Sequence, residues 1–88
     1  MEKKLSKEEI KVKAIELVSA KLGVDYGDIT PKSNFTADLG CDSLDLVEMV
    51  MGVEKTFGIS IPDSDTQRFN TVGDVIDYLE EKLDAQLS

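Results

Sequence analysis

A serine beside an acidic residue, just before an apolar helical pattern, is the feature of this sequence that most directly suggests chemistry. Ser43 follows Asp42 in the stretch LGCDSLDLVEMVM, which runs from Leu39 to Met51. A serine hydroxyl in such a place can cap a helix, or it can carry a covalently attached group. The neighbouring residues bear on which of these two roles applies.

The position of Ser43 is compatible with an attached phosphoryl group. Asp42 is the better helix cap, because its carboxylate can accept hydrogen bonds from the first free backbone N–H groups. Ser43 then becomes the first helical residue and has no structural task that needs a hydroxyl. A helix N-terminus favours an anion, and Gly40 leaves the preceding loop open to an enzyme. A plain helix start remains the alternative interpretation.

The composition excludes several other kinds of chemistry. The chain has no histidine and a single cysteine, Cys41, so histidine-based triads, ordinary zinc sites and an internal disulfide are impossible. Neither glycine-rich nucleotide loop is present. Acidic segments that begin at Asp25, Asp38 and Asp63 lack the glycine that a calcium loop needs at its sixth position. We expect no catalytic residue and no metal site.

The charge balance of the chain indicates what kinds of partner it can have. Hydrophobic residues make up 41% of the 88 residues and charged residues 32%, which is typical of one small globular domain. The formal net charge of −8 disfavours nucleic acid and favours partners with basic patches. No apolar run approaches the roughly 20 residues needed to span a bilayer, and MEKKLSKEEIK at the start is no secretory signal. We expect a cytoplasmic monomer with no transmembrane segment.

The elements that must position Ser43 are predicted to be helices. We expect them over residues 6–22, 42–57, 63–68 and 71–84 of a single domain that spans residues 1–88. The stretch between the first two helices shows no sustained periodicity and predicts a long loop. The predicted fold class is therefore all-α, a small four-helix bundle with a long loop between helices 1 and 2 and a short third helix.

Capping and stop signals define the ends of these helices. Ser6 and Glu9 have the spacing of a capping box at the start of the first helix, and Thr71 and Asp74 have it at the start of the last. Gly23 and Gly58 follow the first and second helices as expected stops. In the long loop, three apolar residues are spaced so that they can anchor it to a core: Ile29, Phe35 and Leu39.

The second helix is apolar on two sides. One stripe has the spacing of a core face and comprises Leu46, Met49, Val50, Val53 and Phe57. A second stripe, rotated away from the first, comprises Leu44, Val47 and Met51, with Asp45, Glu48 and Glu54 beside it. A helix of so small a domain rarely buries both sides, so the second stripe is a candidate partner surface. A wider buried face is the alternative interpretation.

Taken together, these segments resemble a type II acyl carrier protein. DLGCDSLDLVEMVMGVEKTFGISIPD, from Asp38 to Asp63, is similar to the core of that family, with D-S-L in the place of its prosthetic-group motif. KLGVDYGDITPKSNFTADLG resembles the family's long first loop, and FNTVGDVIDYLEEKL resembles its last helix. The resemblance covers nearly the whole chain from Ile10 to Leu83.

The resemblance implies a function and a cofactor. Ser43 would be esterified by 4′-phosphopantetheine, which a separate synthase transfers from coenzyme A. The arm would carry growing acyl chains as thioesters in fatty-acid biosynthesis, and the protein itself would catalyse nothing. The implied partners are the holo-carrier-protein synthase, malonyl transferase, ketosynthases, reductases, a dehydratase and acyltransferases, all of which would use basic patches.

The resemblance also assigns residues to two surfaces. The partner-binding face would comprise Asp42, Leu44, Asp45, Val47, Glu48, Met51 and Glu54. The cavity that shelters the acyl chain is expected between the second and third helices, lined by Leu46, Met49, Val50, Val53, Ile61, Phe69 and Val75.

Two positions depart from the family pattern. Cys41 stands where the family often has alanine, so it is interpreted as a small space-filling residue, with a functional thiol as the alternative. Ser64 stands where the family is usually acidic. A discrete carrier of a polyketide or other specialised lipid pathway is the alternative function. A phosphoserine-regulated or purely structural helical protein is the third interpretation.

Overall fold

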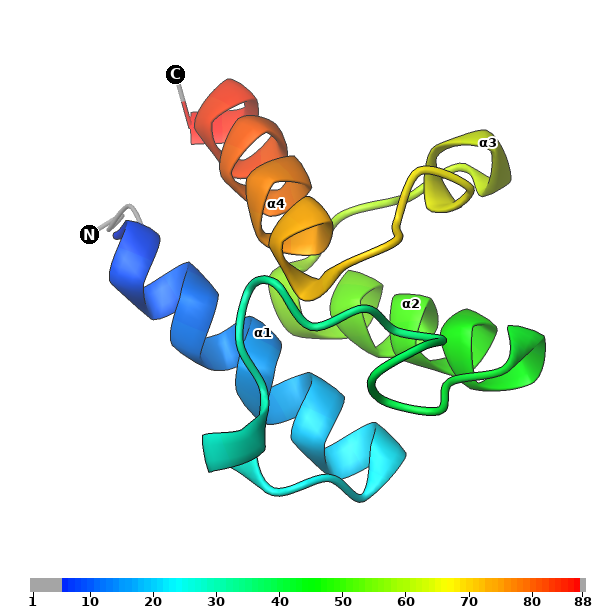
Figure 1. Cartoon of the computed structure of the whole chain (residues 1–88). Coiled ribbons are helices and arrows are strands. Elements are labelled where there is room, and N and C mark those ends of the chain that lie inside the picture. Colours follow the sequence, from blue (N-terminus) through cyan, green and yellow to red (C-terminus); the bar gives the residue numbers. More distant parts are fainter. Residues whose placement is uncertain (1–5, 88) are drawn as a thin grey trace.

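Four helices and one short turn of 3-10 helix form the described part of the chain. The computed structural model describes residues 6–87. Its elements are α1 (Lys7–Leu22), the 3-10 turn η1 (Tyr26–Asp28), α2 (Ser43–Phe57), α3 (Asp63–Thr66) and α4 (Val72–Leu87). α1 packs against both α2 and α4, and α3 lies beyond them, away from α1 (Figure 1). The predicted fold class, an all-α four-helix fold with a short third helix, is confirmed.

Local capping sets where the helices begin and end. The Ser6 side chain accepts a hydrogen bond from the Glu9 N–H, and the Glu9 carboxylate accepts one from the Ser6 N–H. α1 and α2 end at glycines with positive φ angles, 69° at Gly23 and 68° at Gly58. This left-handed conformation favours glycine because an L side chain is strained there. The predicted capping box and both predicted stops are confirmed.

One face of each long helix packs into the core. Ile10, Ala14, Ile15 and Val18 come from α1, whereas Met49, Val50 and Val53 come from α2. α4 contributes Val72, Val75, Ile76, Leu79 and Leu83. Ile29 and Phe35 anchor the long loop to the core as predicted, since they are only 5% and 2% exposed.

The long loop between α1 and α2 also caps the N-terminus of α4 through backbone hydrogen bonds. The loop carbonyls of Ser33 and Pro31 accept hydrogen bonds from the N–H groups of Val72 and Gly73, at 3.0 and 2.8 Å. The first N–H groups of a helix have no acceptor inside the helix. The two loop carbonyls serve as acceptors for them here. The loop passes the start of α4 on its way to α2 (Figure 1).

Three helices start one residue later than predicted, because the predicted ranges included the residues before the first helical turn; two helix ends differ, and one element was missed. α3 ends at Thr66 rather than residue 68, because the N–H groups of Arg68 and Phe69 bond back three residues in tight turns. α4 continues to Leu87, through the good helix formers alanine, glutamine and leucine. η1 was not predicted, since a single turn is too short to leave a periodic pattern.

Candidate functional site

Ser43 is the first residue of α2, and its hydroxyl is free. Asp42 caps the helix: its Oδ1 atom accepts from the Asp45 N–H at 2.8 Å, and the Asp45 carboxylate accepts from the Asp42 N–H at 3.4 Å. The assignment of the cap to Asp42 is confirmed. Ser43 is exposed, and no hydrogen bond to another described residue engages its hydroxyl. The side chain is therefore accessible for reaction without loss of a structural contact.

The two residues before the cap fix the approach to Ser43. Gly40 has a φ of 67°, and the Cys41 N–H donates to the Phe35 carbonyl at 2.8 Å. Cys41 is 4% exposed, and burial, followed by the nearby carboxylates of Asp45 and Asp42, raises the pKa of its thiol. A thiol that stays protonated is a poor nucleophile. This environment fits the interpretation of Cys41 as a space-filling residue.

A hollow of about 260 Å³ lies beside Ser43. Its lining comes from the long loop, the start of α2 and the segment after α3, and comprises Phe35, Thr36, Cys41, Asp42, Ser43, Leu46 and Phe69. The sequence pattern alone does not place Phe35 or Thr36 beside Ser43. The signal available for Phe35 was an isolated aromatic residue in a polar loop, which points to burial but not to a neighbour.

The second stripe of α2 faces outward. Leu44, Val47 and Met51 are 66%, 54% and 59% exposed. The alternative of a wider buried face is therefore wrong. At this helical spacing the three side chains lie on the same side of α2, and exposed apolar side chains that gather on one face mark candidate interaction sites.

Acidic residues around this stripe fall into two groups. Asp42 and Glu48 are exposed, whereas Asp45 and Glu54 are partly buried. Asp45 belongs to the capping box, and Glu54 Oε2 accepts from the Ile61 N–H at 2.7 Å. Glu54 thus holds the chain that leads into α3, a structural role that sequence reasoning missed. A wider hollow of about 420 Å³ lies beside Met51, lined by Lys21, Glu48, Met51, Gly52, Glu54 and Lys55.

A third hollow, of about 180 Å³, separates α2 from α3. It is lined by Leu46, Val47, Val50, Met51, Glu54, Ile61, Asp63 and Thr66. Leu46 also lines the hollow beside Ser43, so the two hollows share that side chain as a wall.

The residues predicted to line an acyl cavity separate into three groups. Leu46, Val50 and Ile61 line the hollow between α2 and α3. Phe69 lines the hollow beside Ser43. Met49, Val53 and Val75 are at most 2% exposed and lie in the closed core, outside both linings.

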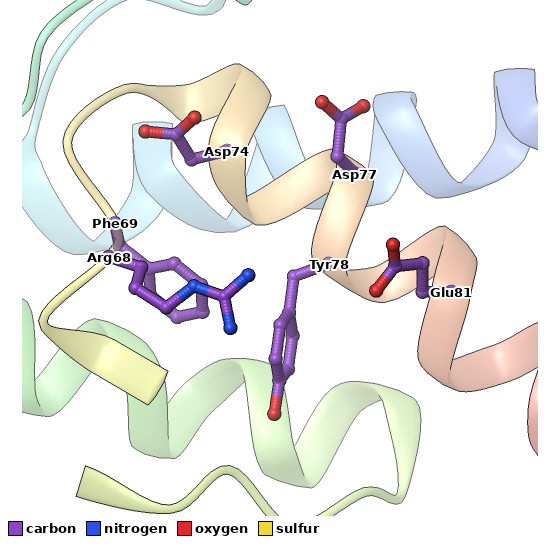
Figure 2. A pocket seen from close by; sticks show the side chains of 6 residues that line it. All are labelled: Arg68, Phe69, Asp74, Asp77, Tyr78 and Glu81. Carbon is purple, nitrogen blue, oxygen red and sulfur yellow. The ribbon is translucent and has the colours of Figure 1, made fainter. Parts of the chain in front are cut away.

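Tyr78 is a further residue that sequence reasoning left without a role. It projects from α4 into a hollow of about 220 Å³ that it shares with Arg68, Phe69, Asp74, Asp77 and Glu81 (Figure 2). Its hydroxyl donates to Asp65 Oδ2 in α3 at 2.7 Å. Burial, together with this hydrogen bond and the charge of Asp65, raises the pKa of Tyr78 to about 12. The phenol is therefore a protonated donor at neutral pH.

The sequence matches a known protein family over most of its length. Residues 13–79 match the family model described as the phosphopantetheine attachment site. The acyl carrier protein of Thermotoga maritima is 46% identical over 78 residues, which cover 89% of this chain and 96% of that protein. Acyl carrier proteins from two strains of Porphyromonas gingivalis are 49% identical over 75 residues, or 85% of this chain and 96% of theirs.

Among the described residues, none of the helices has the length and apolar character to cross a membrane.

Proposed function

Because the chain belongs to the acyl carrier protein family, we propose that it carries growing acyl chains between the enzymes of fatty-acid biosynthesis. Members of the family are carriers and not enzymes, and their cofactor is 4′-phosphopantetheine. When bound, this group supplies a thiol that holds an acyl chain as a thioester. Ser43 is the residue that we assign to its attachment.

The free hydroxyl of Ser43 is the observation that carries this proposal. Asp42 and Asp45 cap α2 between them, so the serine hydroxyl has no capping task. A phosphate ester on the first residue of a helix lies near free backbone N–H groups and the positive end of the helix dipole. The neighbouring hollow gives the arm apolar walls, Leu46 and Phe69, on which to rest.

The exposed face of α2 is the proposed docking surface for partner enzymes. Leu44, Val47 and Met51 supply an apolar centre, and Asp42 and Glu48 supply exposed negative charge beside it. Apolar centres with charged rims are typical of transient interfaces, in which the charges mainly accelerate association. The proposed partners are the holo-carrier-protein synthase, the malonyl transferase, ketosynthases, reductases, the dehydratase and acyltransferases. The proposed location of these partners, and therefore of this protein, is the cytoplasm.

The hollow between α2 and α3 is the proposed entrance to the acyl-chain shelter. An acyl chain in water exposes apolar surface, and each methylene group that is buried gains about 0.8 kcal/mol. Leu46, Val50 and Ile61 offer apolar walls at this place. Met49 and Val53 lie deeper in the core, so an extension of the hollow toward them would require these two side chains to move.

The experiment that tests the attachment is loading with coenzyme A and a carrier-protein synthase, followed by intact-mass and peptide mass spectrometry. We expect one pantetheinyl group on Ser43, none on Ser43→Ala, and normal loading of the control Ser64→Ala, which changes an exposed serine in α3. Modification that persists in Ser43→Ala would disprove the assignment.

The pathway needs a second experiment on the loaded protein. It is offered to the malonyl transferase and ketosynthase of a fatty-acid pathway and, in parallel, to those of a polyketide pathway. Faster elongation by the fatty-acid enzymes is the expected result. Faster elongation by the polyketide enzymes would replace the proposed pathway and leave the carrier role intact.

A further inference from the structure

α3 is held in place by few contacts. None of its four residues is buried. The chain enters it after Ile61 and leaves it before Phe69, and both of these anchors are 6% exposed. Between the anchors, one side-chain hydrogen bond joins the described residues of α3 to another helix, from the Tyr78 hydroxyl to Asp65.

The donor of this hydrogen bond is rigidly placed. Tyr78 is 8% exposed, and its ring meets Phe69 edge-to-face with 5.2 Å between the ring centroids. Lys82 Nζ lies 5.5 Å from the centroid of the same ring. A ring that is fixed on two sides presents its hydroxyl at a defined point, so little side-chain entropy is lost when the hydrogen bond forms. Figure 2 shows the hydroxyl at the end of the side chain that is farthest from α4.

The other side of α3 forms a wall of the hollow between α2 and α3, the proposed entrance for the acyl chain. Asp63 and Thr66 line the hollow opposite Leu46, Val47 and Val50 of α2. In a single helical turn, Asp65 projects away from the side that Asp63 and Thr66 share. Tyr78 therefore holds α3 from the side that faces α4, while the side that faces α2 borders the hollow.

We propose that Tyr78 is a positioning residue that fixes α3 through Asp65 and thereby limits the length of acyl chain that the protein shelters. The inference rests on the proposed function, because it assumes an acyl chain as the guest. With the hydrogen bond intact, α3 stays close to α2 and the hollow stays short. Without it, α3 moves outward between its two anchors and admits a longer chain.

The first test uses the protein without an arm, so it does not depend on the cargo. Tyr78→Phe removes the hydroxyl and keeps the ring contacts, Asp65→Ala removes the acceptor, and Asp65→Asn restores an acceptor oxygen. Hydrogen exchange is followed at the amides of Asp65 and Phe69, which bond to the carbonyls of Pro62 and Thr66. We expect protection at these amides to fall on the order of tenfold in Tyr78→Phe and Asp65→Ala, to recover partly in Asp65→Asn, and to change little in α2. An equal fall throughout the protein, or none, would overturn the inference.

The second test adds the cargo. Acyl groups of increasing length are loaded on the wild type, on Tyr78→Phe and on a control, Lys82→Met, which removes the cation over the ring and leaves the Asp65 contact. We expect the melting temperature to rise with chain length and to level off, and the levelling point to move to longer chains in Tyr78→Phe alone. The same levelling point in all three proteins would overturn the inference. A wild type that shows no dependence on chain length would instead contradict the proposed shelter, while the exchange data still decide whether Tyr78 holds α3.

Discussion

Gly73 lies against the backbone of Pro31 so closely that no side chain fits between them. The Gly73 N–H donates to the Pro31 carbonyl oxygen at 2.8 Å, and a Cβ atom on Gly73 would lie 2.8 Å from that same oxygen. The atom that it would meet belongs to the backbone and cannot rotate away. The first turn of α4 thus needs a glycine for close approach and not for an unusual backbone angle.

We therefore expect Gly73→Ala to lower the free energy of unfolding by about 1–3 kcal/mol. Alanine stabilises an ordinary helix by about 1 kcal/mol relative to glycine, so the expected sign is opposite to the helix propensity. Gly52→Ala is the matched control, because its new Cβ atom would meet the movable ends of Leu17 and Lys21, at 3.2 Å each. Urea unfolding of both variants is the measurement, and a Gly73→Ala variant as stable as Gly52→Ala would contradict the close approach.

The Asp74 carboxylate predicts a particular pH dependence of stability. It accepts from the backbone N–H groups of Thr71 and Asn70 while the Thr71 hydroxyl accepts from the Asp74 N–H, which confirms the predicted capping pair. The hydrogen bond from the Thr71 N–H, with that from Asn70, lowers the pKa of Asp74 from its ordinary value of 3.8. A folded-state pKa below the unfolded one gives stability that is present above pH 3.8 and is lost as the pH falls through the lowered value.

Replacing the carboxylate should make this dependence visible. Asp74→Asn is expected to cost about 1 kcal/mol at pH 7, and its stability gap to the wild type should shrink as the pH drops below 3.8. Asp77→Asn, one turn further along α4 and exposed, is the control and should show a much smaller gap at pH 7. Unfolding curves at several pH values measure this, and a gap for Asp74→Asn that stays constant down to low pH would be inconsistent with the lowered pKa.

Glu48 should act in partner binding through its charge. It is exposed and lies beside Val47 and Met51 on α2. We expect Glu48→Lys to slow loading by the synthase, and we expect rising salt to slow the wild type more than the variant. Exposed charges are screened over about 8 Å at physiological ionic strength.

The control for this charge reversal is Glu16→Lys, an equal change on the exposed side of α1. It should load at a rate close to that of the wild type, and circular dichroism should show equal helix content in all three proteins. Equal rates and equal salt dependence for both variants would leave α2 without an electrostatic role in docking.

Filling the hollow between α2 and α3 should weaken the effect of the cargo on stability. Val50 is 7% exposed and lines that hollow, so the larger side chain of Val50→Trp would occupy the space that a guest needs. In the wild type, a chain sheltered only in the folded state must raise the melting temperature. We expect the variant to show a smaller rise from the unacylated to the acylated form, measured against its own unacylated protein because the tryptophan can also overpack the core. A rise as large as in the wild type would place the guest elsewhere.

The features of this molecule that depend on residues close together in the chain are predictable from the sequence. Caps such as Ser6 with Glu9 and Asp42 for α2 are local, so residue type and spacing are sufficient to predict them. The exposed stripe of α2 was the favoured prediction, because a helix with two apolar sides rarely buries both in so small a domain, although the pattern alone left a wider buried face open.

Contacts between segments that are far apart in the sequence could not be predicted from local patterns. The carbonyl of Pro31 meets Gly73, and the Tyr78 hydroxyl meets Asp65, only because the long loop and α3 are placed by the whole fold. Phe35 was predicted to be buried, but its place in the lining beside Ser43 depends on where the loop crosses the bundle. Nothing in the local pattern at these positions indicates the partner.

The contact between the long loop and α4 has a consequence for protein synthesis. A ribosome synthesises α1, the loop and α2 before it synthesises α4, because translation proceeds from the N-terminus. Until then Ser33 and Pro31 lack the N–H groups that they bind, and Phe35, whose N–H donates to the Asn70 carbonyl, lacks its acceptor. Since the Phe35 carbonyl in turn holds Cys41, two residues before Ser43, the first turn of α2 gains its final surroundings last. A nascent chain should accordingly be a poor substrate for the synthase until α4 has been made and has folded against the loop.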